Sequence, residues 1–203
     1  MQQVIFQQDI DHAMSYEQYK DLIDKLLSEH KTTGPNQSEG LVKYTELNRQ
    51  RMRKWDKTIV LRHDLITKLQ NCKTPMIWVV VTEAWCGDAA QNIPAIAKMA
   101  SINPTISLRI VLRDENPLIM DAYLTGTSRS IPKLIALKKD TLEELGTWGP
   151  RPVEVQKFVM DFKYNPGTMT QEQMYEKVHA WYANDKAQLI QQEFINLLDL
   201  WQA

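Results

Sequence analysis

Hydrophobic residues near the N-terminus recur at helical spacing, and they predict two helices joined by a turn. The first helix covers residues 15–30 and opens on Ser15 and Gln18, which match a capping box. After turn residues at 32–38, the second helix has apolar positions near one face: Leu41, Tyr44, Leu47, Met52 and Trp55. It also carries a positive cluster that we expect to be solvated surface: Arg49, Arg51, Arg53 and Lys54. We expect residues 1–55 to form a helical hairpin that packs on the core.

In the middle of the chain, residues 56–163, segments with the hydrophobic pattern of strands alternate with segments that have helical spacing. Four strands are predicted at 76–82, 106–112, 131–137 and 142–148, and helices at about 62–69, 87–99, 117–124 and 152–162. This order predicts a parallel, right-handed first crossover and an antiparallel hairpin of the last two strands. The expected fold class is therefore α/β, with a central mixed sheet of about four strands flanked by helices.

Residues 164–203 return to helical spacing and predict a C-terminal helical extension. Thr170 and Gln173 form a second capping box, and Asn184-Asp185 is a point where the extension could divide into two helices. Its apolar face could bind a partner, but packing on the chain's own core is the preferred interpretation.

Composition adds limits to this picture. The 203 residues are 43% hydrophobic and 24% charged, which is typical of a folded protein. The net charge of −1 does not indicate binding to nucleic acid or to an anionic membrane. The first residues lack the pattern of a signal peptide, and the longest apolar run, 76–81, is far too short to span a bilayer. A cytoplasmic location is expected, and the oligomeric state stays open.

Two cysteines, Cys72 and Cys86, flank the predicted strand 76–82. Six residues of strand hold its ends roughly 20 Å apart, whereas a disulfide needs Cα atoms within about 7 Å. We therefore expect no internal disulfide, which agrees with a reducing compartment.

Cys86 lies where this strand gives way to a helix, which makes it the strongest candidate for chemistry. A helix N-terminus offers free N–H groups and a positive dipole end, and both favour the nucleophilic thiolate. Trp85 would shield the sulfur and offer an apolar surface to a partner. The alternative interpretation is a small buried hydrophobe at a strand end.

The middle of the chain, roughly residues 56–163, resembles the thioredoxin superfamily at three places. The strand ends in Trp85-Cys86-Gly87, Pro94 follows eight residues after the cysteine, and Ser130-Ile131-Pro132 precedes a strand. The resemblance implies a thioredoxin-like fold, a helix-kinking role for Pro94 and a cis-proline loop facing the cysteine across a groove. Cys86 would be the catalytic residue, and the substrate would bind along Trp85, Gly87, Asp88, Ser130, Ile131 and Pro132. Together with residues 146–152, the Cys-Gly-Asp-Ala loop also resembles a bacterial subfamily of poorly defined role.

The sequence departs from the dithiol pattern of that family. Ala89 stands where the second cysteine is expected, and Val80 replaces the buried acid six residues before the nucleophile. Asp88 is expected to cap the helix, and its charge would oppose thiolate formation. No histidine is expected to approach Cys86, and no metal site or cofactor is indicated. The four histidines are His12, His30, His63 and His179.

Two functions fit these residues. The preferred one is a monothiol redox protein, in which Cys86 forms a mixed disulfide or sulfenic acid that an external thiol resolves. Its partner would be a protein or a low-molecular-weight thiol or disulfide. The alternative is a catalytically inactive module that binds a peptide or protein. Whether the chain is an enzyme stays open, although a classical dithiol reductase is not expected.

Overall fold

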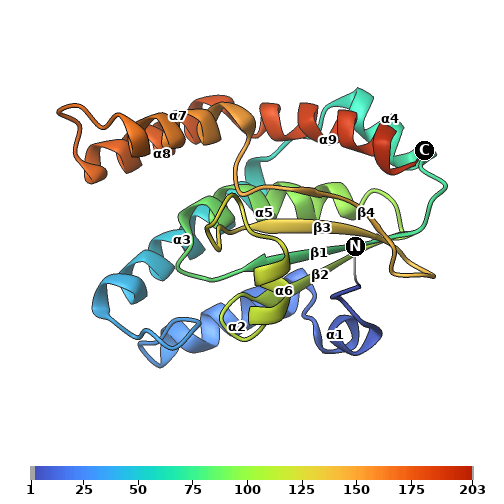
Figure 1. Cartoon of the computed structure of the whole chain (residues 1–203), viewed down its shortest axis with the longest axis horizontal. Helices are drawn as coiled ribbons and strands as arrows, with labels where there is room; N and C mark the ends of the chain where they lie inside the picture. The colour runs from blue at the N-terminus through green and yellow to red at the C-terminus, as the bar shows by residue number, and fades with distance from the viewer. Residues whose placement is uncertain (1–2, 203) are drawn as a thin grey trace.

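The computed structural model describes residues 3–202 and contains four strands and nine helices within that range (Figure 1). The strands are β1 (Met76–Thr82), β2 (Ile106–Leu112), β3 (Lys133–Lys138) and β4 (Glu144–Trp148). The helices are α1 (Gln7–His12), α2 (Tyr16–Ser28), α3 (Glu39–Thr58), α4 (His63–Asn71), α5 (Gly87–Ala100), α6 (Pro117–Ala122), α7 (Val153–Tyr164), α8 (Gln171–Asp185) and α9 (Gln188–Trp201).

The four strands form one mixed sheet in the order β2-β1-β3-β4. β1 pairs in parallel with β2, and the register places Met76 opposite Ile106. β3 is antiparallel to both β1 and β4. The predicted fold class, parallel crossover and terminal hairpin are therefore confirmed. In Figure 1, α7, α8 and α9 lie along one side of the sheet, and α1, α2 and α6 lie along the other.

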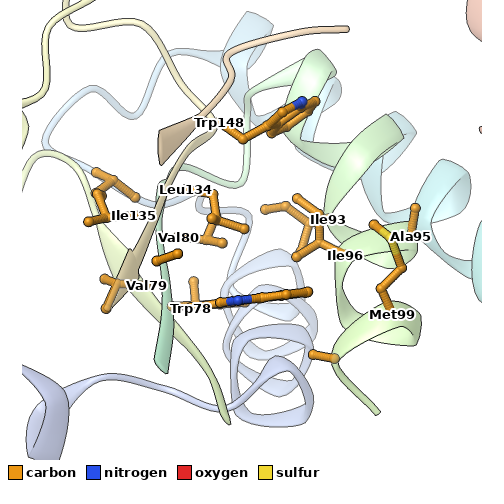
Figure 2. Close-up of a cluster of buried hydrophobic side chains, with 14 of the residues drawn as sticks. Trp78, Val79, Val80, Ile93, Ala95, Ile96, Met99, Leu134, Ile135 and Trp148 are labelled. Carbon is orange, nitrogen blue, oxygen red and sulfur yellow. The ribbon is translucent and has the colours of Figure 1, made fainter. Parts of the chain in front are cut away.

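β1 is buried at every position, which explains its unbroken apolar run. Alternate side chains point to opposite faces of the sheet, and Trp78 and Val80 face α5 with Leu134 (Figure 2). The ring of Trp78 also packs edge-on against Phe194 and Trp201 of α9, with centroids 5.3 and 5.8 Å apart. This face of the sheet is therefore covered by α5 and α9.

The N-terminal helices fold much as predicted, with two differences. The capping box of Ser15 and Gln18 is present at the start of α2, but the short helix α1 was not expected. The predicted apolar face of α3 is also partly wrong, because Tyr44 and Leu47 are exposed. The helix instead buries one face that includes two polar residues: Val42, Thr45, Asn48, Met52 and Trp55.

The C-terminal extension divides near the predicted point, since α8 ends at Asp185. Lys186 and Ala187 follow with φ of 53° and 60°, and this left-handed pair separates α8 from α9. α8 also contributes to a second hydrophobic cluster, distinct from the main core and shared with α7, whose buried residues are Val155, Met174, Val178 and Tyr182. Within residues 3–202, no helix combines the length and apolar character needed to cross a membrane.

Candidate functional site

Cys86 is the N-cap residue of α5, so its own side chain begins the helix. Its Sγ accepts a hydrogen bond from the N–H of Ala89 at 3.4 Å. On the other side, the thiol donates to the carbonyl oxygen of Ile131 at 3.3 Å. The prediction that Asp88 caps this helix is wrong, because the cysteine occupies that position. Both cysteines are free, as expected.

The electrostatic surroundings of Cys86 favour the protonated thiol. Only 8% of the residue is exposed. Burial raises the pKa of the Cys86 thiol to about 12, and the nearby charge of Asp88 adds to this effect. The Ala89 N–H and the Arg151 charge lower the pKa, but they do not offset burial. We expected the helix start to favour a thiolate, and this expectation is wrong. Desolvation raises the pKa of Cys86 more than the N–H group at the helix start lowers it.

The loop before Cys86 is fixed by the N-terminal helices. The backbone N–H of Ala84 donates to the hydroxyl of Thr33 at 2.8 Å, and its carbonyl accepts from the side-chain amide of Asn48 at 3.0 Å. Both partners are almost fully buried. A buried backbone group needs such a partner, and here both come from outside the sheet. Sequence reasoning missed these two residues, although Asn48 shares a helical face with Met52 and Trp55.

A cavity of about 370 Å³ lies beside Cys86. Six of the seven predicted site residues line it: Trp85, Cys86, Gly87, Asp88, Ser130 and Ile131. Pro132, the seventh, is buried and is not part of the wall. The peptide bond between Ile131 and Pro132 is cis. The remaining wall comes from α3, from three arginines and from α8: Leu41, Tyr44, Arg113, Arg129, Arg151, Tyr175, Val178 and His179. We call the last three residues the roof.

Asp88 holds the roof helix against α5. One carboxylate oxygen accepts from the hydroxyl of Tyr182 at 3.0 Å, and the other pairs with Arg151 at 2.8 Å. Asn92 donates to the oxygen of Tyr182 at 2.9 Å. Arg151 reaches this point because Gly149, with φ of +107°, lets the chain pass directly over the carbonyl of Pro132. Asp88 is therefore a docking residue for α8.

His179 also reaches the site, which corrects the prediction that no histidine would approach Cys86. Its Nδ1 lies 3.2 Å from the side-chain amide of Gln91, and its ring lies beside Gly87. Burial lowers the pKa of His179 to about 4, and the charge of Arg51 contributes. The ring is therefore neutral at pH 7. No hydrogen bond joins His179 to Cys86 among the residues that the structure describes.

The positive cluster on α3 is also only partly solvated surface. Arg53 and Lys54 are exposed, as expected, whereas Arg49 and Arg51 are half-buried. Arg49 forms a two-pronged hydrogen bond with Asp24. Arg51 points toward the start of α5, where one guanidinium nitrogen lies 3.9 Å from the position that a Cβ on Gly87 would take.

Glu83, the other carboxylate near the loop, is fully buried. One of its oxygens accepts from the backbone N–H of Asp114 at 2.9 Å. Burial raises the pKa of its carboxyl group. This hydrogen bond links the end of β1 to the segment after β2.

Comparisons with known proteins agree with this geometry. A family model described as thioredoxin matches residues 34–163 and therefore includes α3. No curated protein matches the chain. A crystal structure of a protein of unknown function from Pseudomonas aeruginosa has a TM-score of 0.59 at 16% identity, covering 92% of this chain and 98% of that one. An HIV epitope scaffold has a TM-score of 0.53 at 17% identity, with the same coverage. These two likenesses support the fold, and the family match identifies the chain as a member of the thioredoxin family.

Proposed function

We propose that this protein is a thioredoxin-like binding module, which holds a small ligand in the cavity beside Cys86 without thiol chemistry. The proposal rests mainly on one observation, which is that the Cys86 sulfur is held as a protonated thiol. Cys86 is buried, its S–H group donates to the Ile131 carbonyl, and its pKa is raised to about 12. Thiol exchange needs the thiolate, and such a pKa leaves on the order of one thiol in 10⁵ ionised at pH 7.

Two further features support binding over turnover. Ala89 replaces the thiol that would resolve a mixed disulfide, and Val80 replaces the buried proton acceptor of the dithiol family members. The volume of about 370 Å³ falls within the range of small-molecule sites. The roof residues of α8 form part of its wall, and the size of the cavity favours a small ligand or one inserted side chain.

The proposal is tested by the reactivity of the two cysteines toward a neutral probe, hydroxyethyl disulfide, at neutral pH. A Cys72→Ser variant leaves Cys86 as the only thiol, and Cys86→Ser leaves Cys72. We expect mass spectrometry to find that Cys86 is modified no faster than Cys72, and that both react quickly in urea. Reaction of native Cys86 about tenfold or more faster than Cys72 would overturn the proposal.

That second result would favour the other candidate, a monothiol redox protein. Its support is the Ala89 N–H that points at the sulfur and the arginines in the wall. In that reaction the Cys86 thiolate attacks a ligand disulfide RSSR, which forms Cys86–S–S–R and releases RS⁻. An external thiol R′SH then releases Cys86 as the free thiol and leaves as RSSR′. The partner would be a protein or a low-molecular-weight disulfide, and the loop would place the chain in the single-cysteine bacterial subfamily.

A further inference from the structure

We infer that the chain has a second binding site, on the face of the sheet beside α1 and α2, and that this site takes a small molecule with a phosphate group. α1 and α2 lie along one side of the sheet (Figure 1), and residues of both helices and of β1 and β2 line a cavity of about 800 Å³ there. This volume falls within the range of small-molecule sites. None of the residues that line it also lines the cavity beside Cys86, so the inference goes beyond the proposed function.

Backbone pairing fixes the walls of this second cavity. The register of the sheet places Ile77 of β1 beside Ser107 of β2, and Arg109 follows two residues later. Because side chains alternate along a strand, these three residues share one face of the sheet. At the outer edge of β2, the N–H of Met14 donates to the carbonyl of Ile110 at 2.9 Å, and the N–H of Ile110 donates back at 2.8 Å. The segment that joins α1 to α2 is therefore attached to the sheet beside the cavity.

Two cations that line the cavity have no acidic partner within residues 3–202. The half-buried guanidinium of Arg109 donates to the carbonyl of the preceding Leu108 at 3.1 Å. Neither this group nor the ammonium of Lys139 forms an ion pair with a carboxylate of the described residues. The next arginine along the chain differs, because Arg113 pairs with Asp114 at 2.8 Å. Taking a charge partly out of water without a partner costs free energy, and a ligand oxyanion would supply the missing partner.

The sheet places these two cations on either side of Ile77. Arg109 is level with Val79, the residue two positions after Ile77. Lys139 follows the antiparallel strand β3, and its backbone N–H donates to the carbonyl of Pro75, two positions before Ile77, at 3.0 Å. Both side chains line the same cavity as Ile77. An anion above Ile77 would therefore have a cation on each side.

Two hydroxyl groups add further donors to the wall. Ser107 lines the cavity from β2, and Ser15 lines it from the start of α2. The Oγ of Ser15 accepts from the N–H of Gln18 at 3.2 Å, so its own proton is available to a ligand. Asp11 is the one acidic residue among those that line the cavity, and its carboxylate accepts from the side-chain amide of Gln7 at 2.7 Å. The wall therefore offers more positive charge than negative charge.

A phosphate group matches this set of donors. At neutral pH it carries a charge of about −2 and three acceptor oxygens, whereas a carboxylate carries one charge and two oxygens. The cavity is larger than one phosphate needs, and Ile10 and Ile77 give it an apolar surface. We therefore expect the phosphate to lie near Ser107, between Arg109 and Lys139, with the organic part of the ligand against the two isoleucines.

An NMR titration at neutral pH tests the inference with three probes: butyl phosphate, inorganic phosphate and butanoate. We expect butyl phosphate to bind most tightly, because it alone combines the phosphate with an apolar part, and we expect it to shift the backbone amide signals of Ser107 and Arg109. Arg109→Gln should weaken its binding about tenfold or more, because it removes a charged donor. Lys139→Gln should weaken it about threefold, since this lysine is exposed. Arg53→Gln is the matched control, because it removes the same charge outside the cavity and should change the affinity less than about twofold.

Circular dichroism checks that each variant is folded, and Lys139→Gln changes only an exposed turn, so it keeps the test valid if Arg109→Gln does not fold. Absence of butyl phosphate binding by the wild-type chain would overturn the inference and leave Arg109 as a charge that protects an edge strand. Equal binding by the wild type and both variants would overturn it as well. Tighter binding of butanoate would contradict the phosphate assignment, and signal shifts confined to the loop at Cys86 would place the anion in the other cavity. None of these failures affects the proposed function, which concerns different residues.

Discussion

Helices α8 and α9 follow one another along the chain, but different interactions attach them to the rest of the protein. α9 buries Phe194, Leu198 and Trp201 in the main core, where two of these rings pack on Trp78. α8 keeps its apolar side chains in the small cluster with α7 and contacts α5 through polar groups. Those contacts are the hydrogen bonds of Tyr182 with Asp88 and Asn92 and of His179 with Gln91.

The difference separates a helix that stabilises the fold from a helix that forms the site. Burial of aromatic side chains contributes several kcal/mol and does not depend on pH. Hydrogen bonds to a buried carboxylate or a neutral histidine contribute less and depend on protonation. We therefore expect changes in α9 to lower the overall stability more than changes in α8, which also alter the surroundings of Cys86.

The largest effect is expected for Phe194→Ala in α9. Phe194 is fully buried and contacts Trp78, Trp148 and Trp201. Its loss should lower the free energy of unfolding by about 3–5 kcal/mol. Urea unfolding measures this change. Leu200→Ala is the control, because that side chain is 70% exposed on the same helix. A loss below about 1 kcal/mol for Phe194→Ala would contradict the role given to α9.

A smaller effect is expected for Tyr182→Phe in α8. The change leaves the ring in place but removes the O–H group that donates to Asp88. The carboxylate of Asp88 is largely buried, so the loss of this donor should lower the unfolding free energy by about 1–3 kcal/mol. Tyr164→Phe on α7 is the matched control, since that residue is 70% exposed. Equal stability of Tyr182→Phe and wild type would show that α8 is not held through Asp88.

The smallest effect concerns pH. The pKa of His179 is about 4 in the folded chain and about 6.5 in an unfolded one. The unfolded chain therefore takes up the proton first, and stability falls as the pH drops from 6.5 toward 4. Because the ring is only half-buried, we expect a loss of about 1–2 kcal/mol rather than the full value of the shift.

This loss is measured as the difference between wild type and His179→Gln in urea unfolding at both ends of that pH range. The comparison cancels the other acids that titrate there, including Asp88, whose pKa is raised by burial. Wild type should lose more stability than His179→Gln on acidification. Parallel losses would mean that the histidine is not held in its neutral form.

Much of the fold follows from local patterns in the sequence. The buried run 76–82, the capping boxes at Ser15 and Thr170 and the break after Asp185 each indicate an element that the structure contains. The short helix α1 was missed because it buries only Ile10 and has little apolar periodicity. The buried face of α3 was shifted because Thr45 and Asn48 are polar, and their hydrogen-bonding partners are not visible in a hydrophobic pattern.

The site was harder to predict because its residues come together from distant parts of the chain. Cys86 and the loop at 130–131 were found through their family resemblance, and they do line the cavity. His179 and Arg51 lie on helices outside that resemblance, and nothing local distinguishes them from surface residues. The opposing charge of Asp88 was predicted from the sequence, but the burial that has the largest effect on the pKa of Cys86 was not, because it depends on how distant segments pack.

The central claim is that Cys86 is a buried, protonated thiol that donates to the Ile131 carbonyl, and its titration tests this most directly. The ultraviolet absorbance of the thiolate is followed against pH in Cys72→Ser, with the doubly substituted Cys72→Ser, Cys86→Ser chain subtracted to remove tyrosine. We predict no ionisation of Cys86 up to about pH 10. A midpoint at or below the ordinary value of about 8.5 would contradict the account.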